Sequence, residues 1–260
     1  MRTSIAFAAA AALACLGAAP AFAGDVSFVS VTGDDTRNCA APATACRTFQ
    51  RAHDATSPHG EIIALTPGDY RPVTIFKSIS ITGVEGAGIF GGADNQITVS
   101  ALDSDVVHLT GLTLEGAASA ARGVRVDGGY VTIRKCAIRN MAISALYYNF
   151  ASGLIEDSSI SNGNANINVR RGSALVHRVV SRAARAHAIT LDGGGATISE
   201  TVAADSPSGI FQGGALFMTR STVTGNVQHG MDGGFTSAGD NFIRGNGTNV
   251  SGTIANIGRQ

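Results

Sequence analysis

Five side chains in the second half of the chain have types that suit a polymer with sugar rings and acidic groups: Tyr147, Asn149, Arg170, Asp192 and Phe211. Aromatic rings stack on the apolar faces of sugars, and a guanidinium binds a carboxylate through two hydrogen bonds. In a coiled chain, Tyr147 and Phe211 lie three turns apart, roughly 14 Å at the spacing of strands in a sheet. The five residues are therefore the candidates for binding a polysaccharide.

Arg170 and Asp192 are also the candidate catalytic residues. An arginine beside a carboxylate-bound metal could remove the proton next to a uronate carboxyl group, which is the chemistry of a lyase. Such a lyase could use calcium, which needs six or more oxygen ligands, and the chain offers only Asp192, Asn149 and Asn168. Asp127 and Asp192 lie roughly 14 Å apart, too far for the carboxyl pair of a glycoside hydrolase. An exposed ion pair between Arg170 and Asp192 is the favoured alternative, with no metal or cofactor.

These spacings follow from a hydrophobic residue that recurs every 20 to 22 positions in two registers. The first register consists of Ile133, Ile155, Val176, Ile198 and Met218. The second consists of Val124, Leu146, Ile167, Ile189, Ile210 and Met231. Two registers that keep the same period indicate a solenoid, in which each turn stacks on the one before it.

The residue types indicate that each turn is built from strands. Short stretches such as Val131–Ile138 and Leu154–Ile160 mix β-branched and polar residues. Turn-forming residues that tolerate a left-handed backbone follow at Asn140, Asn162, Asp205, Asn226 and Asn246. A helical repeat is the alternative, but the 33 glycines argue against it. The sequence therefore predicts an all-β right-handed parallel β-helix with about 21 to 22 residues per turn.

The first 23 residues have the pattern of a secretory signal peptide. Arg2 precedes an apolar stretch from Ile5 to Leu16, and Ala21-Phe-Ala23 forms a cleavage site of small residues. The stretch is too short for a membrane span, and Cys15 gives an imperfect lipoprotein pattern as the alternative. We therefore expect a secreted or periplasmic protein.

Three cysteines follow the predicted signal peptide. Cys39 and Cys46 are seven positions apart in one loop, and an oxidising compartment favours a disulfide between them. Cys136 takes an inward position for small residues in the repeat, so we expect a buried free thiol. Thr48 can cap a short helix that extends to Ala55 and covers the open end of the coil. The expected organisation is residues 24–60 for this loop and helix, and residues 61–260 for the β-helix.

Three segments lie near the start of the predicted mature chain: Cys46-Arg-Thr-Phe-Gln-Arg-Ala, Gly60-Glu-Ile-Ile-Ala-Leu-Thr-Pro-Gly-Asp-Tyr70 and Val73-Thr-Ile-Phe-Lys-Ser-Ile-Ser-Ile-Thr-Gly83. They resemble the opening of pectate-lyase-like right-handed β-helix proteins. The resemblance implies a capping helix, a first strand, a Pro-Gly-x-Tyr turn and a second strand. It implies no activity, because this superfamily contains lyases, hydrolases, adhesins and other binding proteins.

The balanced charge of the chain and the absence of known catalytic motifs limit the functions that we expect. The 19 basic and 19 acidic residues balance and form no block of one sign, so a nucleic-acid partner is not expected. The Asn-Thr-Asp, Gly-His-Gly and Arg-Ile-Lys segments typical of polygalacturonases are absent, as is the Arg-x-Pro-x-x-Arg segment of pectate lyases. We expect a non-catalytic binding, adhesive or scaffold protein for polysaccharide. The alternative is a lyase or hydrolase that acts on an acidic polysaccharide along the outer face of the coil.

Overall fold

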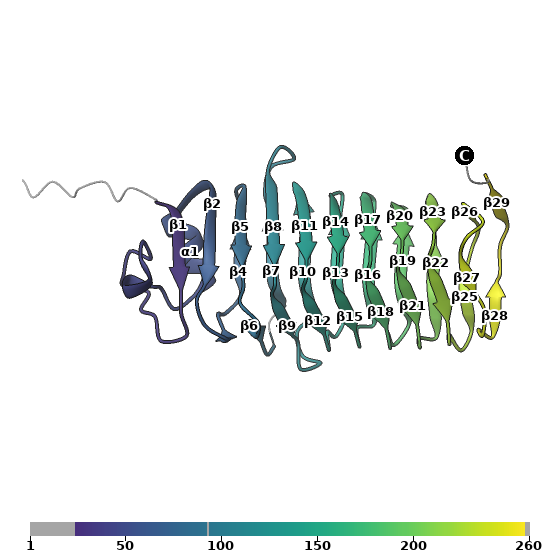
Figure 1. Cartoon of the computed structure of the whole chain (residues 1–260), viewed down its shortest axis with the longest axis horizontal. Helices are drawn as coiled ribbons and strands as arrows, with labels where there is room; N and C mark the ends of the chain where they lie inside the picture. Colours follow the sequence, from purple (N-terminus) through teal and green to yellow (C-terminus); the bar gives the residue numbers. More distant parts are fainter. Residues whose placement is uncertain (1–23, 93, 258–260) are drawn as a thin grey trace, which may run out of the picture.

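The computed structural model describes residues 24–92 and 94–257, which wind into one elongated right-handed parallel β-helix of about nine turns (Figure 1). The predicted signal peptide lies outside the described residues. Three parallel sheets extend along the coil, and we name them sheets A, B and C. The fold class predicted from the repeat is confirmed.

Successive turns add one strand to each sheet. Sheet A has 11 strands: β1 (Gly24–Val29), β2 (Thr56–Ala64), β5 (Ile79–Thr82), β8 (Val106–Thr110), β11 (Tyr130–Arg134), β14 (Ser152–Glu156), β17 (Ser173–His177), β20 (Gly195–Ser199), β23 (Leu216–Thr219), β26 (Phe235–Ser237) and β29 (Ile254–Asn256). Sheet B has nine: β3 (Gly68–Asp69), β6 (Ala87–Phe90), β9 (Thr113–Glu115), β12 (Ala137–Arg139), β15 (Ser159–Ser161), β18 (Val180–Arg182), β21 (Val202–Ala204), β24 (Thr222–Thr224) and β27 (Phe242–Ile243). Sheet C also has nine: β4 (Val73–Ile75), β7 (Asn95–Ser100), β10 (Arg122–Gly128), β13 (Ser144–Asn149), β16 (Ala165–Arg170), β19 (His187–Asp192), β22 (Ser208–Gln212), β25 (His229–Asp232) and β28 (Thr248–Val250).

Both hydrophobic registers are stacks of paired residues inside the coil. The first register lies in sheet A, where Ile133 pairs with Ile155 and the pairing continues to Met218. The second lies in sheet C, where Val124 pairs with Leu146 and the pairing continues to Met231. Their members are almost completely buried. The constant period thus builds one continuous apolar core.

Left-handed residues form the corners of the coil. After sheet B, Asn140 and Asn162 have φ of 61° and 59°, which confirms the expected turn chemistry. The same expectation is wrong at Asn226, because Gly225 takes the left-handed position with φ of 68°. Asn226 is instead buried and donates from Nδ2 to the Asn246 side-chain oxygen over 2.9 Å. These two asparagines therefore stack as a ladder inside the corner.

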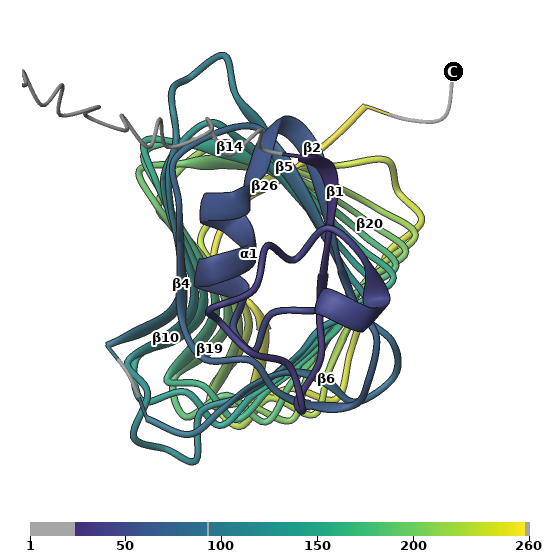
Figure 2. The same cartoon turned by 90° about the vertical axis from the view of Figure 1, so that its left-hand side faces the viewer.

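A short helix covers the N-terminal end of the coil. Helix α1 (Phe49–Ala55) begins after Thr48, whose hydroxyl accepts a hydrogen bond from the Arg51 backbone N–H. The buried Phe49 ring lies 4.8 Å from the Tyr70 ring, and Figure 2 shows α1 lying across the opening. Because the first apolar turn is covered, this end presents little of the exposed edge that promotes aggregation.

The loop before α1 contains the predicted disulfide. Cys39 and Cys46 are joined, near the short 3-10 helix η1 (Pro42–Thr44), while Cys136 is a buried free thiol. Strand β1 pairs with β2 in the same region, so sheet A includes residues that precede position 61. Within residues 24–92 and 94–257, no helix has the length and apolar character needed to cross a membrane.

Candidate functional site

The candidate binding residues lie in two columns on the outer face of sheet C. Tyr147 pairs with Asn168, and Thr190 pairs with Phe211, so the first column has the order that the repeat predicts. Asn149 pairs with Arg170 in the second column. The residues between the two columns point inward and are fully buried: Tyr148, Val169 and Leu191. Alternation along each strand therefore places the candidates on one outer strip.

Tyr147 is held between two arginines from other turns. Arg170 donates from Nη1 to the Tyr147 hydroxyl over 3.3 Å. On the ring, the guanidinium carbon of Arg122 lies 4.8 Å from the centroid, a cation–π contact. The pKa of Arg170 lies above its ordinary value, first because of the hydrogen bond to Tyr147 and also because of the charge of Asp192. The ring is thus fixed beside two cations.

The candidate catalytic pair is a weak exposed contact. Arg170 Nε lies 3.8 Å from Asp192 Oδ2, and the two side chains are 49% and 65% exposed. Exposed pairs of this kind contribute about 1 kcal/mol or less to stability. A base must be neutral before it can accept a proton, so the raised pKa of Arg170 works against a role as a base.

Of the residues considered for calcium, Asn149 and Asp192 each contact another side chain, whereas Asn168 Oδ1 has no partner in the described protein. The Asp127 carboxylate accepts from Arg125 Nε over 2.6 Å and from Asn149 Nδ2 over 3.1 Å. Asp192 lies three turns beyond Asp127 along sheet C, and its carboxylate faces Arg170 rather than Asp127 and Asn149. In the described part of the chain, no three His, Cys, Asp or Glu residues are grouped so that they could hold a metal ion.

Sequence reasoning missed a third column on the same strip, formed by Arg122, His187 and His229. The pairing of His187 with Ser208 and of Ser208 with His229 places them in line. The His187 ring lies 5.3 Å from the Phe211 ring, so the third column borders the first. Burial lowers the pKa of His187, and the charge of Asp232 opposes this effect. His187 and His229 lie 42 positions apart, which is two periods of 21 residues, and this spacing is the signal that could have identified the column.

Polar atoms without partners are concentrated on this strip. Among residues 24–92 and 94–257, eight buried side-chain nitrogen or oxygen atoms have no hydrogen-bond partner. Six of the eight lie on the outer columns of sheet C: Asn95 Oδ1, Arg122 Nε, Asn168 Oδ1, His187 Nδ1, Thr190 Oγ1 and His229 Nδ1. Each unpaired buried group costs about 1 to 3 kcal/mol. The outer columns of sheet C therefore hold most of the buried polar side-chain atoms that have no partner within the described protein.

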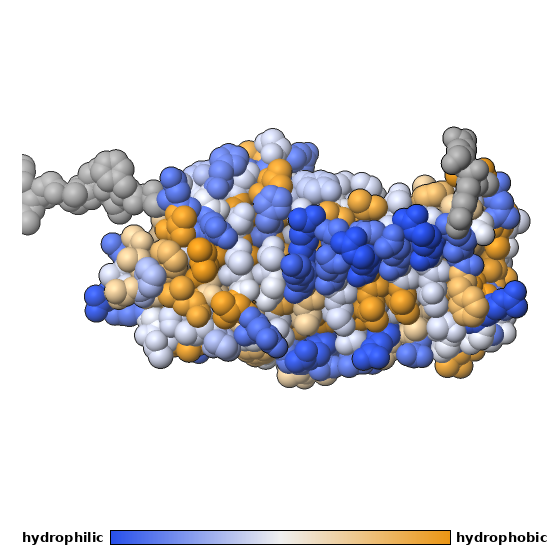
Figure 3. Space-filling model, in the orientation of Figure 1, coloured by the Kyte–Doolittle hydropathy of each residue, from blue (hydrophilic) through white to orange (hydrophobic). Residues whose placement is uncertain are grey.

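The other charged cluster is neutralised within the protein. At the corner between sheets A and B, Glu156 binds Arg134 over 2.7 Å and Arg178 over 2.8 Å. Farther along, Glu200 binds Arg220 over 2.9 Å. We call this row the charged ridge, and Figure 3 shows it as a hydrophilic band along the coil. Its charges are already paired across turns.

No protein-family model and no curated protein matches the chain. Among solved structures, the chain is similar to the crystal structure of pectate lyase Pel9A, with a TM-score of 0.68 and 15% sequence identity. The match covers 89% of this chain and 76% of that chain. A likeness at this level of identity shows the fold alone. The protein therefore has the pectate-lyase-like right-handed β-helix fold that its N-terminal segments resemble.

Proposed function

We propose that the protein is an exported β-helix that binds an acidic polysaccharide along the outer face of sheet C without cleaving it. One observation carries the proposal: two partly exposed aromatic rings, Tyr147 and Phe211, share the outer columns of sheet C with six buried polar atoms that have no partner in the described protein. A sugar ring offers hydroxyl groups that both donate and accept, together with an apolar face for stacking. This combination matches the chemistry of the strip.

Two arginines favour an acidic sugar. Among the described residues, no carboxylate lies within ion-pair distance of Arg122, whose guanidinium contacts the Tyr147 ring. The ion pair of Arg170 with Asp192 is weak and exposed, so a ligand carboxylate can displace it. Because a guanidinium can bind a carboxylate through two hydrogen bonds, both arginines can recognise uronate groups beside the stacked rings.

The same geometry favours binding over cleavage. Arg170 is held as a cation by Tyr147 and Asp192, and Asp127 is bound to Arg125 and Asn149. The Cys39–Cys46 disulfide supports a location outside the reducing cytosol. A lyase remains the alternative function, and its support is the likeness of the fold to that of a pectate lyase.

Calorimetry with hexagalacturonate and with an uncharged hexasaccharide tests the proposal. We expect the acidic sugar to bind more tightly, and its affinity to fall as salt rises because ions screen exposed charges. Absence of hexagalacturonate binding, or an affinity for it that does not change with salt, would contradict acidic recognition. Absorbance from new double bonds, followed with and without calcium, tests the alternative. A steady increase with the native protein that is lost in Arg170→Gln would establish a lyase.

A further inference from the structure

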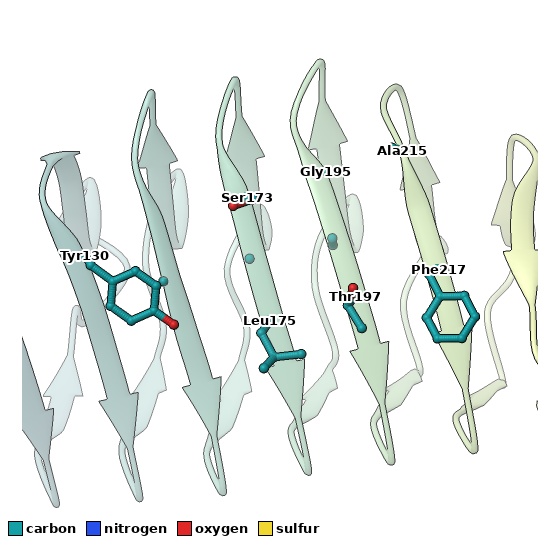
Figure 4. Close-up of a pocket in the computed structure, with 10 residues that line it drawn as sticks. Tyr130, Ser173, Leu175, Gly195, Thr197, Ala215 and Phe217 are labelled. Atoms are coloured by element: carbon teal, nitrogen blue, oxygen red, sulfur yellow. The ribbon is translucent and has the colours of Figure 1, made fainter. Parts of the chain in front are cut away.

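The outer face of sheet A contains a long hollow that lies outside the strip on sheet C. It has a volume of about 510 Å³ and extends from strand β11 to strand β23. Figure 4 shows Tyr130 at one end, Leu175 and Thr197 in the middle and Phe217 at the other end. The volume lies within the range of about 300 to 1,000 Å³ that is common for ligand sites. We call this hollow the sheet A groove.

The groove has an apolar and aromatic lining along the axis of the coil. Tyr130 and Leu175 are each 41% exposed. Tyr130 and Phe217 lie four strands apart, roughly 19 Å at the usual strand spacing. A second hollow of about 480 Å³ adjoins the first at Phe217 and continues over Thr236 and Ala255. The lining therefore suits an elongated ligand that contacts separated rings.

A glycine, which has no side chain, helps to keep the groove open at position 195. A Cβ atom on Gly195 would meet the Ala215 carbonyl oxygen at 3.5 Å and the Ala215 Cβ at 3.9 Å, which are ordinary contacts. By contrast, a Cβ on Gly153 would lie 2.2 Å from the Val131 carbonyl oxygen, so packing requires that glycine. The fold does not require glycine at position 195. Its effect is to leave space above the sheet between Tyr130 and Phe217.

The borders of the groove favour an uncharged ligand. The charged ridge beside it is neutralised by the pairs of Glu156 with Arg134 and Arg178. Hydroxyl groups of Ser173 and Thr197 lie on the groove lining. The backbone beneath is paired within sheet A, because β17 pairs with β14 and β20. A peptide strand therefore finds no free edge here, and recognition depends on side chains.

We infer that the sheet A groove is a second carbohydrate-binding surface, specific for uncharged sugar units. A sugar ring has an apolar face for Tyr130 or Phe217 and a rim of hydroxyl groups for Ser173 and Thr197. A hydrocarbon chain would leave one side in water in so shallow a groove. Sheets A and C lie on different sides of the coil (Figure 2). One molecule can therefore hold an uncharged chain on sheet A independently of any ligand on sheet C.

Calorimetry with cellohexaose, xylohexaose and mannohexaose tests this inference, with hexagalacturonate as the acidic sugar. Native protein should bind at least one of the uncharged sugars. Gly195→Leu should fill the groove and Phe217→Ala should remove a stacking platform, and each should weaken that binding about tenfold. Ser159→Leu is the control: it places a leucine side chain on the exposed outer face of β15 in sheet B, and it should leave the affinity for the uncharged sugar unchanged.

Three results would overturn the inference. The first is that native protein binds none of the three uncharged sugars. The second is that Gly195→Leu and Phe217→Ala bind the uncharged sugar as tightly as native protein does, while their circular dichroism and melting temperature are those of native protein. The third is that Arg170→Ala abolishes binding of the uncharged sugar, which would place that sugar on sheet C. Retained hexagalacturonate binding in Gly195→Leu separates the two surfaces.

Discussion

Arg170 and Tyr147 lie on neighbouring turns, and the guanidinium of Arg170 donates to the Tyr147 hydroxyl over 3.3 Å. This hydrogen bond is the first cause of the raised pKa of Arg170. The ring is contacted as well by Arg122. A stacking platform and a carboxylate-binding cation are thus coupled before any ligand arrives, and such preorganisation lowers the entropic cost of binding.

Tyr147→Phe separates the roles of the ring and the hydroxyl. This variant keeps the stacking surface and loses only the hydrogen bond to Arg170, so hexagalacturonate affinity should fall by about 1 kcal/mol or less. Tyr147→Ala removes the platform and should cost about 1 to 3 kcal/mol. Calorimetric titration of both variants measures the difference. Equal losses would show that the ring does not stack on the sugar.

The cap depends on Phe49. This side chain is fully buried and packs on Tyr70, so Phe49→Ala should lower the free energy of unfolding by about 3 to 5 kcal/mol. Urea denaturation measures the change. Glu85→Ala, an exposed change near the same end, should have almost no effect. A Phe49→Ala protein as stable as native protein would contradict the capping role of α1.

The cap should also weaken in acid because of His53. Burial lowers the pKa of this histidine from its ordinary value of 6.5, although Asp54 opposes the shift and Lys77 adds to it. Its Nε2 accepts from the Phe76 N–H over 3.4 Å, a contact that requires the neutral ring. Well above pH 6.5, His53 is neutral in both the folded and the unfolded state, and the full stability is present.

As pH falls below 6.5, the unfolded state binds a proton first, so the free energy of unfolding decreases. Thermal melts between about pH 7 and pH 5 should show this decrease. The decrease should be smaller in His53→Gln, because glutamine does not titrate. An identical pH dependence in the two proteins would show that other groups cause it.

Thiol labelling of the protein without residues 1–23 distinguishes its three cysteines. Burial raises the pKa of Cys136 to about 11, so a labelling reagent at about pH 8 should not react with the native protein. Denaturation without reductant should release Cys136 alone, because Cys39 and Cys46 are joined. Release of two additional thiols before reduction would show that the bridge is absent in solution.

The sequence was sufficient for the coil because its period is set by the circumference of one turn. Residues such as Ile133 and Ile155 must stack for each turn to share the core, so their spacing predicts their pairing. Strand β1 was not predicted, because its pattern is inverted: Val26 is 38% exposed, whereas Ser27 is buried. The Ser27 hydroxyl accepts from Thr56 over 2.8 Å, and this partner is invisible to a hydrophobic pattern.

The candidate site on sheet C was predictable only in part, because one of its strands departs from the regular pattern. Strict alternation assigns His187 and Thr190 to opposite faces because they are three positions apart. In the structure Ala188 and Ile189 are both buried, so the strand departs from alternation and both outer columns share one face. The sheet A groove could not be predicted because small residues such as Gly195 form it, and in a sequence glycine indicates a turn.

Calorimetry of hexagalacturonate binding to Arg170→Ala, beside native protein and Glu200→Ala, tests whether sheet C recognises an acidic polysaccharide. Glu200 is the matched control, because it is an exposed charge on the charged ridge that pairs with an arginine, Arg220. We predict that Arg170→Ala loses about 1 to 3 kcal/mol of binding free energy with its melting temperature unchanged, whereas Glu200→Ala binds as native protein does. Equal affinity of all three proteins, or no binding by native protein, would contradict polysaccharide recognition on sheet C.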